Sequence, residues 1–259
     1  MNENLKSIFY PLLLLGGLLV LWVFAVRNWG VPNYILPSFE SVLGALRRGY
    51  IEGAYWKDFG YTLSSMLLGY VSGCALAFIM GMMFAEFRWL ERLLYPFVLG
   101  LQSMPKVALA PLILVWFGFG IGSKAVMVAL VCFFPMFINT AVGLKATDPS
   151  LIDLMRAFSA SRLQILMRIK IPSAASHIFA GLQISIVLGL IGAVVAEFVS
   201  SSHGLGYLIN NATTTLDTST MFAALISLAV IGILGSQIIK FLQRKLVFWE
   251  NDNDTQVAA

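Results

Sequence analysis

Long apolar runs without a charged residue alternate along the chain with shorter polar segments. Each run is about as long as the ~20 residues that a helix needs to cross a bilayer. Because lipid offers the backbone no hydrogen-bond partners, helices are expected, and the ~10-residue alternation of membrane barrels is not seen. The pattern predicts an all-α polytopic membrane protein with six spans, at 7–26, 59–85, 93–118 (interrupted by Lys106), 125–144, 173–196 and 218–239.

The polar segments between the spans differ in length and character. Residues 27–58 contain a mildly amphipathic run at 38–50, which predicts a short helix on the outer surface. A glycine turn at 117–122 and a polar loop at 200–217 are also expected on the outer side. We therefore predict a single transmembrane domain over 1–250, followed by a disordered tail at 251–259.

Composition supports this class. Hydrophobic residues make up 59% of the 259 residues, charged residues 12%, and the mean hydropathy is +0.84. These values exclude an ordinary soluble enzyme and a disordered chain, since soluble domains carry about 25% charged residues. The formal net charge is +4, which we attribute to cytoplasmic loops that retain Lys and Arg rather than to nucleic-acid binding.

The positive charges also predict an orientation. Six spans place both termini on one side, and the first apolar run is read as an uncleaved span because no small-residue cleavage site follows it. Lys6, Arg88, Arg92, Lys145, Arg156, Arg162, Arg168, Lys170, Lys240, Arg244 and Lys245 lie on the side of the termini, against Arg27, Arg47, Arg48, Lys57 and Lys124 on the other. The positive-inside rule then predicts cytoplasmic termini.

The segment 145–172 is the most informative cytoplasmic stretch. Asp148 is a good helix N-cap and Pro149 suits the first helical position. The run Ser159-Ala160-Ser161 ends this helix, and a second helix is expected from Arg162 to Lys170, ended by Pro172. This helix-turn-helix is either a rigid knob for the groove of a soluble partner or a basic amphipathic segment that rests on anionic lipid.

The same segment resembles the cytoplasmic loop of permease subunits of binding-protein-dependent ABC importers, whose pattern is E-A-A-x3-G-x9-I-x-L-P. Asp153 stands at the Glu position, Leu154 and Met155 at the two Ala positions, and Ser159 at the Gly position. Ile169-Lys170-Ile171-Pro172 matches I-x-L-P with the expected spacing, although the preceding consensus letters are substituted.

Further motifs resemble the nitrate/sulfonate/taurine-type branch of these permeases. They keep their order and spacing from about residue 36 to 245. They are Met104-Pro105-Lys106-Val107-Ala108-Leu109-Ala110-Pro111-Leu112, Trp116-Phe117-Gly118, Phe133-Phe134-Pro135, Asn139-Thr140 with Gly143, Gly181-Leu182, Val195-Ala196-Glu197-Phe198 and Gly204-Leu205-Gly206-Tyr207-Leu208.

The resemblance implies a type I ABC importer permease in a bacterial cytoplasmic membrane. Two copies would form the pore, an extracytoplasmic binding protein would deliver the solute, and two cytoplasmic ATPase subunits would carry ATP and Mg. The chain itself would be no enzyme and hold no cofactor, and no G-x-x-x-x-G-K-[ST] sequence is present. The residues implied in ATPase coupling are Asp153, Leu154, Met155, Arg156, Ala157, Phe158, Ser159, Ala160, Ser161, Arg162 and Pro172.

Polar residues inside the spans are candidates for a translocation path: Gln102, Lys106, Asn139, Gln183 and Glu197. A charge at membrane depth usually faces a cavity or a partner, so Lys106 either attracts an anionic solute or reaches an interface or a structural partner. Glu197 either pairs with Lys106 or caps the outer loop. For the three amides, hydrogen bonding between helices is the alternative to pore lining.

Other chemistry receives little support from the sequence. His177 and His203 have no Cys, Asp or Glu at metal-ligand spacing, so no metal site is predicted. Cys74 and Cys132 lie in apolar runs and are interpreted as buried structural thiols. The resemblance to this branch of permeases implies a small, anionic or heterocyclic cargo: nitrate, a sulfonate, taurine, an aromatic carboxylate or a pyrimidine precursor. A secondary transporter or channel without an ATPase, and a non-transporting scaffold, are the alternatives.

Overall fold

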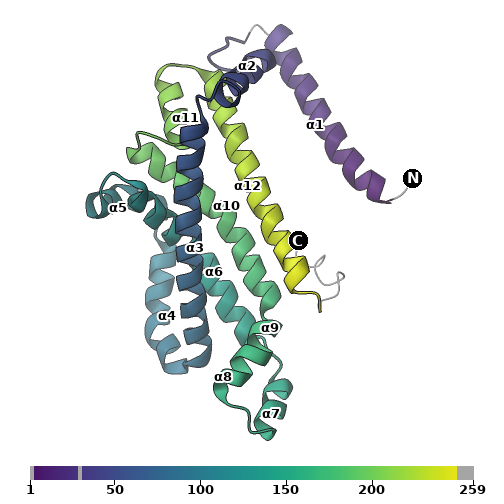
Figure 1. Ribbon diagram of the computed structural model, residues 1–259, viewed down its shortest axis with the longest axis vertical. Helices are drawn as coiled ribbons and strands as arrows, with labels where there is room; N and C mark the ends of the chain where they lie inside the picture. The colour runs from purple at the N-terminus through teal and green to yellow at the C-terminus, as the bar shows by residue number, and fades with distance from the viewer. Residues whose placement is uncertain (1–2, 29–30, 250–259) are drawn as a thin grey trace.

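The computed structural model describes residues 3–28 and 31–249, and every regular element among them is a helix (Figure 1). In chain order these are α1 (Glu3–Asn28), α2 (Phe39–Tyr50), α3 (Trp56–Glu86), α4 (Arg88–Ser103), η1 (Lys106–Leu109), α5 (Ala110–Phe117), α6 (Ile121–Lys145), α7 (Pro149–Ala157), α8 (Arg162–Ile165), η2 (Leu166–Lys170), α9 (Ile171–Ser173), α10 (Ala175–Ser200), α11 (Leu205–Thr214) and α12 (Thr218–Leu246). The expected all-α class is confirmed.

Four helices in the described part of the chain are individually long and apolar enough to cross a membrane: α3, α6, α10 and α12. They confirm the second, fourth and fifth predicted spans to within about four residues at each end, and the sixth, whose helix α12 continues beyond residue 239 to Leu246. The apolar part of α1 among the described residues covers only Gly16–Asn28. Figure 1 shows α1 leaning away from the other long helices. The total of six spans therefore stays a prediction.

The third predicted span, 93–118, is wrong as a single helix. It is broken into α4 and the pair η1–α5, which meet at an angle of 88°. Met104 and Pro105 are extended at the break, with ψ angles of 137° and 97°. Proline lacks an N–H and disfavours helical geometry at the preceding residue, so the Met104–Pro105 step ends α4.

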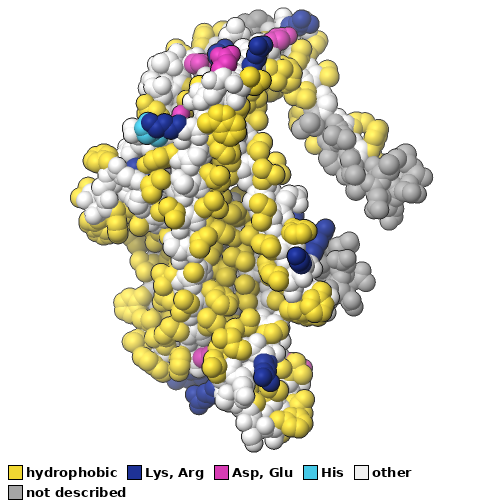
Figure 2. Space-filling view, in the orientation of Figure 1, with side chains coloured by type: hydrophobic (Ala, Val, Ile, Leu, Met, Phe, Trp, Pro, Cys, Tyr) yellow, Lys and Arg dark blue, Asp and Glu magenta, His cyan; other side chains and the backbone are white. Residues whose placement is uncertain are grey.

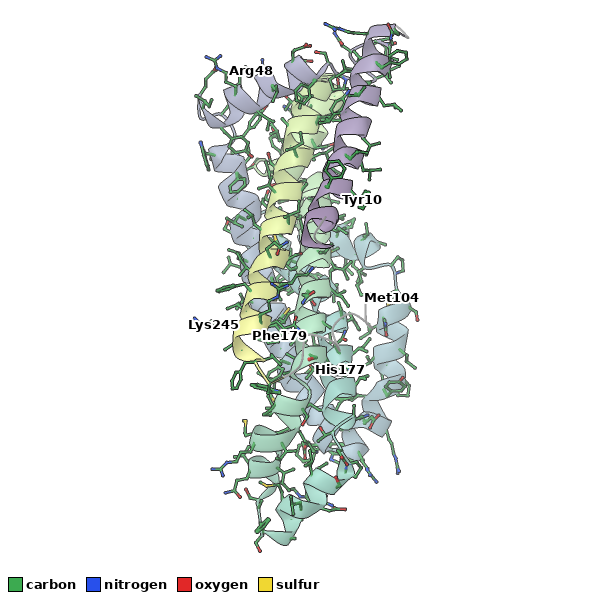
Figure 3. All side chains as sticks on the ribbon, turned by 90° about the vertical axis from the view of Figure 1, so that its right-hand side faces the viewer. Tyr10, Arg48, Met104, His177, Phe179 and Lys245 are labelled. Atoms are coloured by element: carbon green, nitrogen blue, oxygen red, sulfur yellow. The ribbon has the colours of Figure 1, made fainter. Side chains whose placement is uncertain are left out.

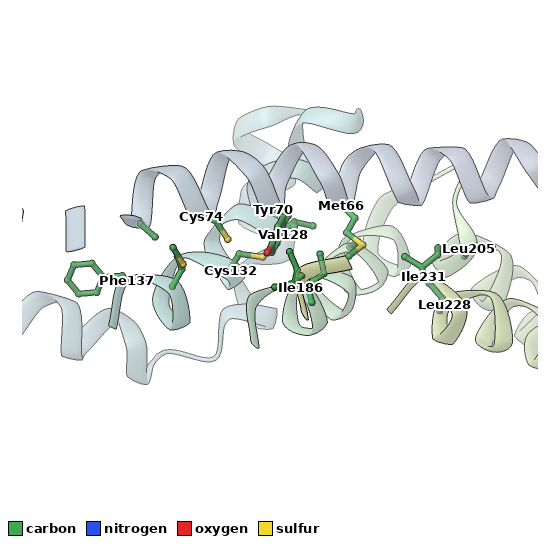
Figure 4. Packing of buried hydrophobic residues seen from close by; sticks show 14 of the residues in the cluster. Met66, Tyr70, Cys74, Val128, Cys132, Phe137, Ile186, Leu205, Leu228 and Ile231 are labelled. Carbon is green, nitrogen blue, oxygen red and sulfur yellow. The ribbon is translucent and has the colours of Figure 1, made fainter. Parts of the chain in front are cut away.

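The core forms where α3, α6 and α10 pack together, and Figure 4 shows its buried side chains. Two glycines let α3 approach α6 closely. A Cβ on Gly69 would lie 2.4 Å from the carbonyl oxygen of Ala125, and one on Gly73 would lie 2.6 Å from that of Ala129. Cys74 and Cys132 are buried, free thiols in this core, as predicted.

Charged side chains gather near α2 and near the opposite ends of the helices. The side of the bundle seen in Figure 2 is otherwise largely hydrophobic. This distribution is typical of a chain whose middle lies in lipid.

The short helix predicted at 38–50 is confirmed as α2. The hydroxyl of Ser38 accepts a hydrogen bond from the backbone N–H of Ser41 at 3.2 Å and caps the helix. Trp22 of α1 donates to the carbonyl of Pro37 at 3.0 Å, which connects α1 to this end of the molecule. Helix α11 was not predicted, because it lies in the polar segment 200–217 that was interpreted as a loop.

The end of the second helix predicted in the segment 145–172 also differs from the prediction. Pro172 lies in the first turn of α9, where a missing N–H is tolerated, and the helical run is interrupted at Ala174 instead, with a ψ of 0°. Between α8 and α9, residues Leu166–Lys170 form a π-helix. The predicted tail at 251–259 lies outside the described residues.

Candidate functional site

Helices α7 and α8 project from the end of the molecule opposite α2 (Figure 1). The Asp148 carboxylate caps α7 by accepting a hydrogen bond from the backbone N–H of Ser150 at 2.8 Å. This hydrogen bond holds the pKa of Asp148 below its ordinary value. Arg156 and Asp153 form an exposed ion pair at 3.2 Å along the helix. Local hydrogen bonds therefore define α7 at its first turn.

The turn after α7 has one unusual residue. Ser159 has a φ of +58°, in the left-handed region that favours glycine. Its N–H donates to the carbonyl of Arg156 at 2.8 Å, and the N–H of Ala160 donates to that of Met155 at 3.0 Å. Ser159 occupies the position where the resemblance expects glycine, so this backbone conformation accounts for that letter of the pattern.

Helix α8 begins with a capping box. The hydroxyl of Ser161 accepts from the N–H of Gln164 at 3.3 Å, and the Gln164 side chain accepts from the N–H of Ser161 at 2.7 Å. Both short helices of the segment thus have side-chain caps at their N-termini. These caps favour a defined shape in a segment whose tip lies away from the core.

One ion pair connects this segment to the bundle, and a second joins two helices of the bundle itself. Lys170 in η2 pairs with Glu86 at the end of α3, and Lys145 at the end of α6 pairs with Glu91 in α4. The first pair is the more enclosed, with side-chain exposures of 15% and 20% against 41% and 31%. A cavity of about 190 Å³ lies beside it, lined by Glu86, Phe87, Arg162, Leu163 and Leu166.

Most residues implied in ATPase coupling are exposed in this chain. Phe158 at the tip is 76% exposed, although large apolar side chains are normally buried in contacts. Exposed are Asp153, Leu154, Arg156, Ala157, Phe158, Ser159, Ser161 and Arg162, while Met155, Ala160 and Pro172 are half-buried. Most side chains of the segment are therefore accessible to a partner or a lipid layer.

The candidate path residues do not form one cluster. Gln102 and Lys106 line a common cavity of about 450 Å³ at the break between α4 and η1. Asn139 donates to the carbonyl of Pro135 in its own helix at 2.8 Å. Gln183 donates to the Gln243 side chain at 2.7 Å and so links α10 to α12. Gln183 thus makes the hydrogen bond between helices that was predicted as the alternative to pore lining.

Lys106 faces this cavity and contacts α6. Its ammonium nitrogen lies 4.7 Å from the ring centroid of Phe134 and donates to the Gln102 carbonyl at 3.3 Å. That carbonyl lies in the last turn of α4, where carbonyls lack partners within the helix. Phe134 is part of the motif Phe133-Phe134-Pro135. Its position beside Lys106 was not predicted, because it depends on the break in the third span.

Glu197 is buried at the α2 end of the bundle, where it caps the turn between α10 and α11, as the second alternative for this residue predicts. It accepts hydrogen bonds from the hydroxyl of Thr62 at 2.8 Å and from the N–H of Gly206 at 2.7 Å. The alternative of a pair with Lys106 is wrong. The cation near Glu197 is Lys124, 1% exposed, which donates to the carbonyl of Ser200 at 2.7 Å.

Sequence reasoning missed Thr62, Asp58 and Lys124 as parts of this network. Gly204 donates its N–H to Asp58 at 2.8 Å, and Leu205 donates to the hydroxyl of Thr62 at 2.8 Å. The signals for this arrangement in the sequence were the capping alternative for Glu197 and the two glycines of the motif Gly204-Leu205-Gly206-Tyr207-Leu208. Within residues 3–28 and 31–249, no group of three or more His, Cys, Asp or Glu residues is arranged to hold a metal ion.

Long apolar helices, a broken span and a capped helical segment at one end define a polytopic helical membrane protein. Residues 73–248 match the family described as "Binding-protein-dependent transport system inner membrane component". The chain belongs to this family of ABC-transporter permeases. It has the corresponding permease fold, and the family works with ATPase and binding-protein subunits.

Individual relatives extend over nearly the whole chain. The chain is 39% identical over 233 residues to the riboflavin transport system permease protein RibX of Chloroflexus aurantiacus, covering 90% of this chain and 87% of that protein. It is 30% identical over 240 residues to the putative aliphatic sulfonates transport permease protein SsuC of Bacillus subtilis, covering 93% and 87%. Inward-facing MetNI methionine ABC transporter shows a similar fold, with a TM-score of 0.56, 18% identity and coverage of 78% of this chain and 98% of that one.

Proposed function

We propose that this chain is the pore-forming subunit of an ATP-driven importer that takes up a small, anionic solute. Two copies form the pore in a bacterial cytoplasmic membrane, with both termini in the cytoplasm. An extracytoplasmic binding protein delivers the solute, and two cytoplasmic ATPase subunits bind ATP and Mg. The family membership supports the permease role, and RibX and SsuC illustrate how widely the cargo of such permeases varies.

The observation that carries this proposal is the exposed α7–α8 segment, connected to the bundle by an ion pair. A soluble partner that grips a helix needs exposed apolar anchors, and Phe158 and Leu154 are 76% and 54% exposed. Since Lys170 pairs with Glu86, a displacement of α8 and η2 acts on the end of α3. Movement of an ATPase is thereby coupled to a helix of the membrane core.

The anionic class of the cargo rests on charge. Lys106 lies at the break of the third span beside a cavity, where an ammonium group favours a negatively charged ligand. Gln102 lies beside it, while Asn139, Gln183 and Glu197 make hydrogen bonds within the protein. In this proposal Gln102 and Lys106 face the path, and the other three residues position its helices.

Co-purification tests the ATPase partnership. Tagged chain is purified from its native host in mild detergent, and bound proteins are identified by mass spectrometry. We expect a stoichiometric ATPase that is lost with Ala157→Glu or Arg156→Glu, because these changes place negative charge on the exposed face of α7. Arg48→Glu is the matched control, since Arg48 lies on α2 at the opposite end of the molecule (Figure 3).

The alternative predicts a different result. A secondary transporter would purify stably without an ATPase, and deletion of residues 153–161 would leave transport intact. Transport that vanishes on this deletion, while the protein still elutes as a single species, supports the importer. Retained transport with no ATPase bound would overturn it.

A further inference from the structure

The cavity at the broken span has walls from three parts of the chain. Gln102, Met104, Pro105, Lys106 and Val107 come from the break between α4 and η1. Helix α6 contributes Val131, Phe134, Pro135 and Ile138, and α10 contributes Leu188, Ile191 and Gly192. The volume of about 450 Å³ lies within the range of about 300–1,000 Å³ that is typical of small-molecule sites. Figure 3 shows Met104 near mid-height of the bundle, away from both ends.

One end of this cavity is cationic and unneutralised. Within the described part of the chain, ion pairs join Lys or Arg side chains to Glu91, Asp153 and Glu86, a histidine lies near Asp58, and none of these contacts involves Lys106. An ammonium group has three donors, and one of those of Lys106 is directed to the carbonyl of Gln102. A cation at membrane depth without a carboxylate is costly unless a ligand supplies the negative charge.

The remaining wall is apolar. Val107, Val131, Ile138, Leu188 and Ile191 offer no polar side-chain atom, and the ring of Phe134 lies beside the ammonium group of Lys106. A small inorganic anion would exchange its hydration shell for this wall and gain few hydrogen bonds. An apolar molecule without charge would leave Lys106 unpaired. The two halves of the cavity therefore match a ligand with both an anionic head and an apolar body.

We propose that this cavity is a solute-binding site within the membrane domain, selective for organic anions with a ring-sized apolar body. A carboxylate or sulfonate head contacts Lys106 and the amide of Gln102, and the body packs against Phe134, Ile138 and Ile191. This inference rests on the proposed import function and narrows its cargo. In this inference the permease itself selects among solutes, after the binding protein has released them.

Three probes separate the contributions of charge and apolar body. Benzenesulfonate has both, sulfate has only the charge, and benzyl alcohol has only the body. Binding of each is measured by isothermal titration calorimetry to the permease–ATPase complex in lipid nanodiscs, without binding protein. We expect benzenesulfonate to bind at least about tenfold more tightly than either of the others, because each single-feature probe loses one half of the contacts.

Variants of the cavity assign this binding to named residues. Lys106→Met weakens benzenesulfonate binding about tenfold or more, and Lys106→Arg retains most of it because the charge persists. Phe134→Leu weakens binding severalfold without changing the charge. Lys240→Met is the matched control: Lys240 is an exposed lysine of α12 outside the cavity, and its loss leaves the affinity unchanged.

Each contrary result has a defined meaning. Equal affinities for the three probes, no binding of benzenesulfonate, or unchanged binding in Lys106→Met overturns the site. Should Lys106→Met fail to assemble, Lys106→Gln and Phe134→Leu decide in its place. Bound ATPase is quantified in the same nanodiscs. A complex that contains the ATPase but does not prefer benzenesulfonate over the other two probes refutes this inference and leaves the proposed import function standing. A permease that binds no ATPase refutes the proposed import function.

Discussion

The carboxyl carbon of Glu197 lies 2.4 Å from the position that a Cβ on Gly204 would occupy. Gly204 has a φ of +117°, and two residues later the N–H of Gly206 donates to the same carboxylate at 2.7 Å. The Glu197 carboxylate of α10 therefore holds the start of α11. Glycine is needed at positions 204 and 206 because the backbone there passes too close to the Glu197 side chain for a Cβ. The turn between these helices is built around Glu197.

Gly204→Ala is expected to destabilise the protein by about 3 kcal/mol, from backbone strain together with the clash on Glu197. The apparent melting temperature of the purified protein in detergent measures this loss. Gly53→Ala is the matched control, since Gly53 has a φ of +90° but nothing within 4 Å of the added Cβ. It isolates the backbone term of about 1–2 kcal/mol. Equal effects of the two variants would contradict a clash with Glu197.

Ser159→Gly is expected to stabilise the turn after α7 by about 0.5 kcal/mol. Glycine removes the strain of the left-handed conformation but loses more entropy on folding, so the net gain is small. Ser159→Val is expected to cost about 2 kcal/mol, because a branched side chain fits this φ poorly. Melting temperature and ATPase co-purification are measured for both variants. A valine variant with the same melting temperature and the same amount of bound ATPase as the glycine variant would show that the backbone at residue 159 is not strained.

The long helices could be predicted from the sequence because each is specified by its own apolar run. Helices α3, α6, α10 and α12 required only continuous hydrophobicity, which is a local property. The capped start of α7 at Asp148 was also a local signal. The bend at Met104 was missed because the apolar run continues through it, although Pro105 marks the place.

The candidate site was less accessible to sequence reasoning, since it depends on contacts between distant segments. Lys106 could be singled out as a charge within a span, but its position over Phe134 follows from the bend and from the packing of η1 on α6. Likewise, Glu197 was recognised as a candidate, while its partner Thr62 is 135 positions away. Spacing along the chain carries no information about such partners.

The ion pair of Lys170 with Glu86 is expected to matter more than that of Lys145 with Glu91, because it is more enclosed. Lys170→Met leaves the Glu86 carboxylate without its partner and costs about 2 kcal/mol, whereas Lys145→Met costs under about 1 kcal/mol. Glu86→Gln combined with Lys170→Met recovers part of the loss, since no unpaired charge remains. Melting temperatures of the three variants give the comparison, and equal costs for the two lysines would contradict it.

Tyr50 on α2 predicts a pH dependence at alkaline pH. Its hydroxyl donates to Ser227 at 2.6 Å, and burial raises the pKa of the Tyr50 phenol above its ordinary value of 10.0. The unfolded chain ionises this phenol near pH 10, while the folded chain keeps it protonated. The free energy of unfolding is therefore insensitive to this group below pH 10 and falls as the pH rises above 10.

Tyr50→Phe removes this contribution. At neutral pH the variant is expected to lose about 1 kcal/mol with the hydrogen bond to Ser227. Above pH 10 the free energies of unfolding of the variant and the unmodified protein approach each other. Only the unmodified protein loses stability there, because its phenol ionises in the unfolded chain but stays protonated in the folded one. Tyr34→Phe is the control, since that side chain is 57% exposed and its removal leaves the alkaline loss unchanged. Unfolding by denaturant between pH 8 and about pH 11 measures the difference, and a constant gap between Tyr50→Phe and the unmodified protein would contradict the role of burial.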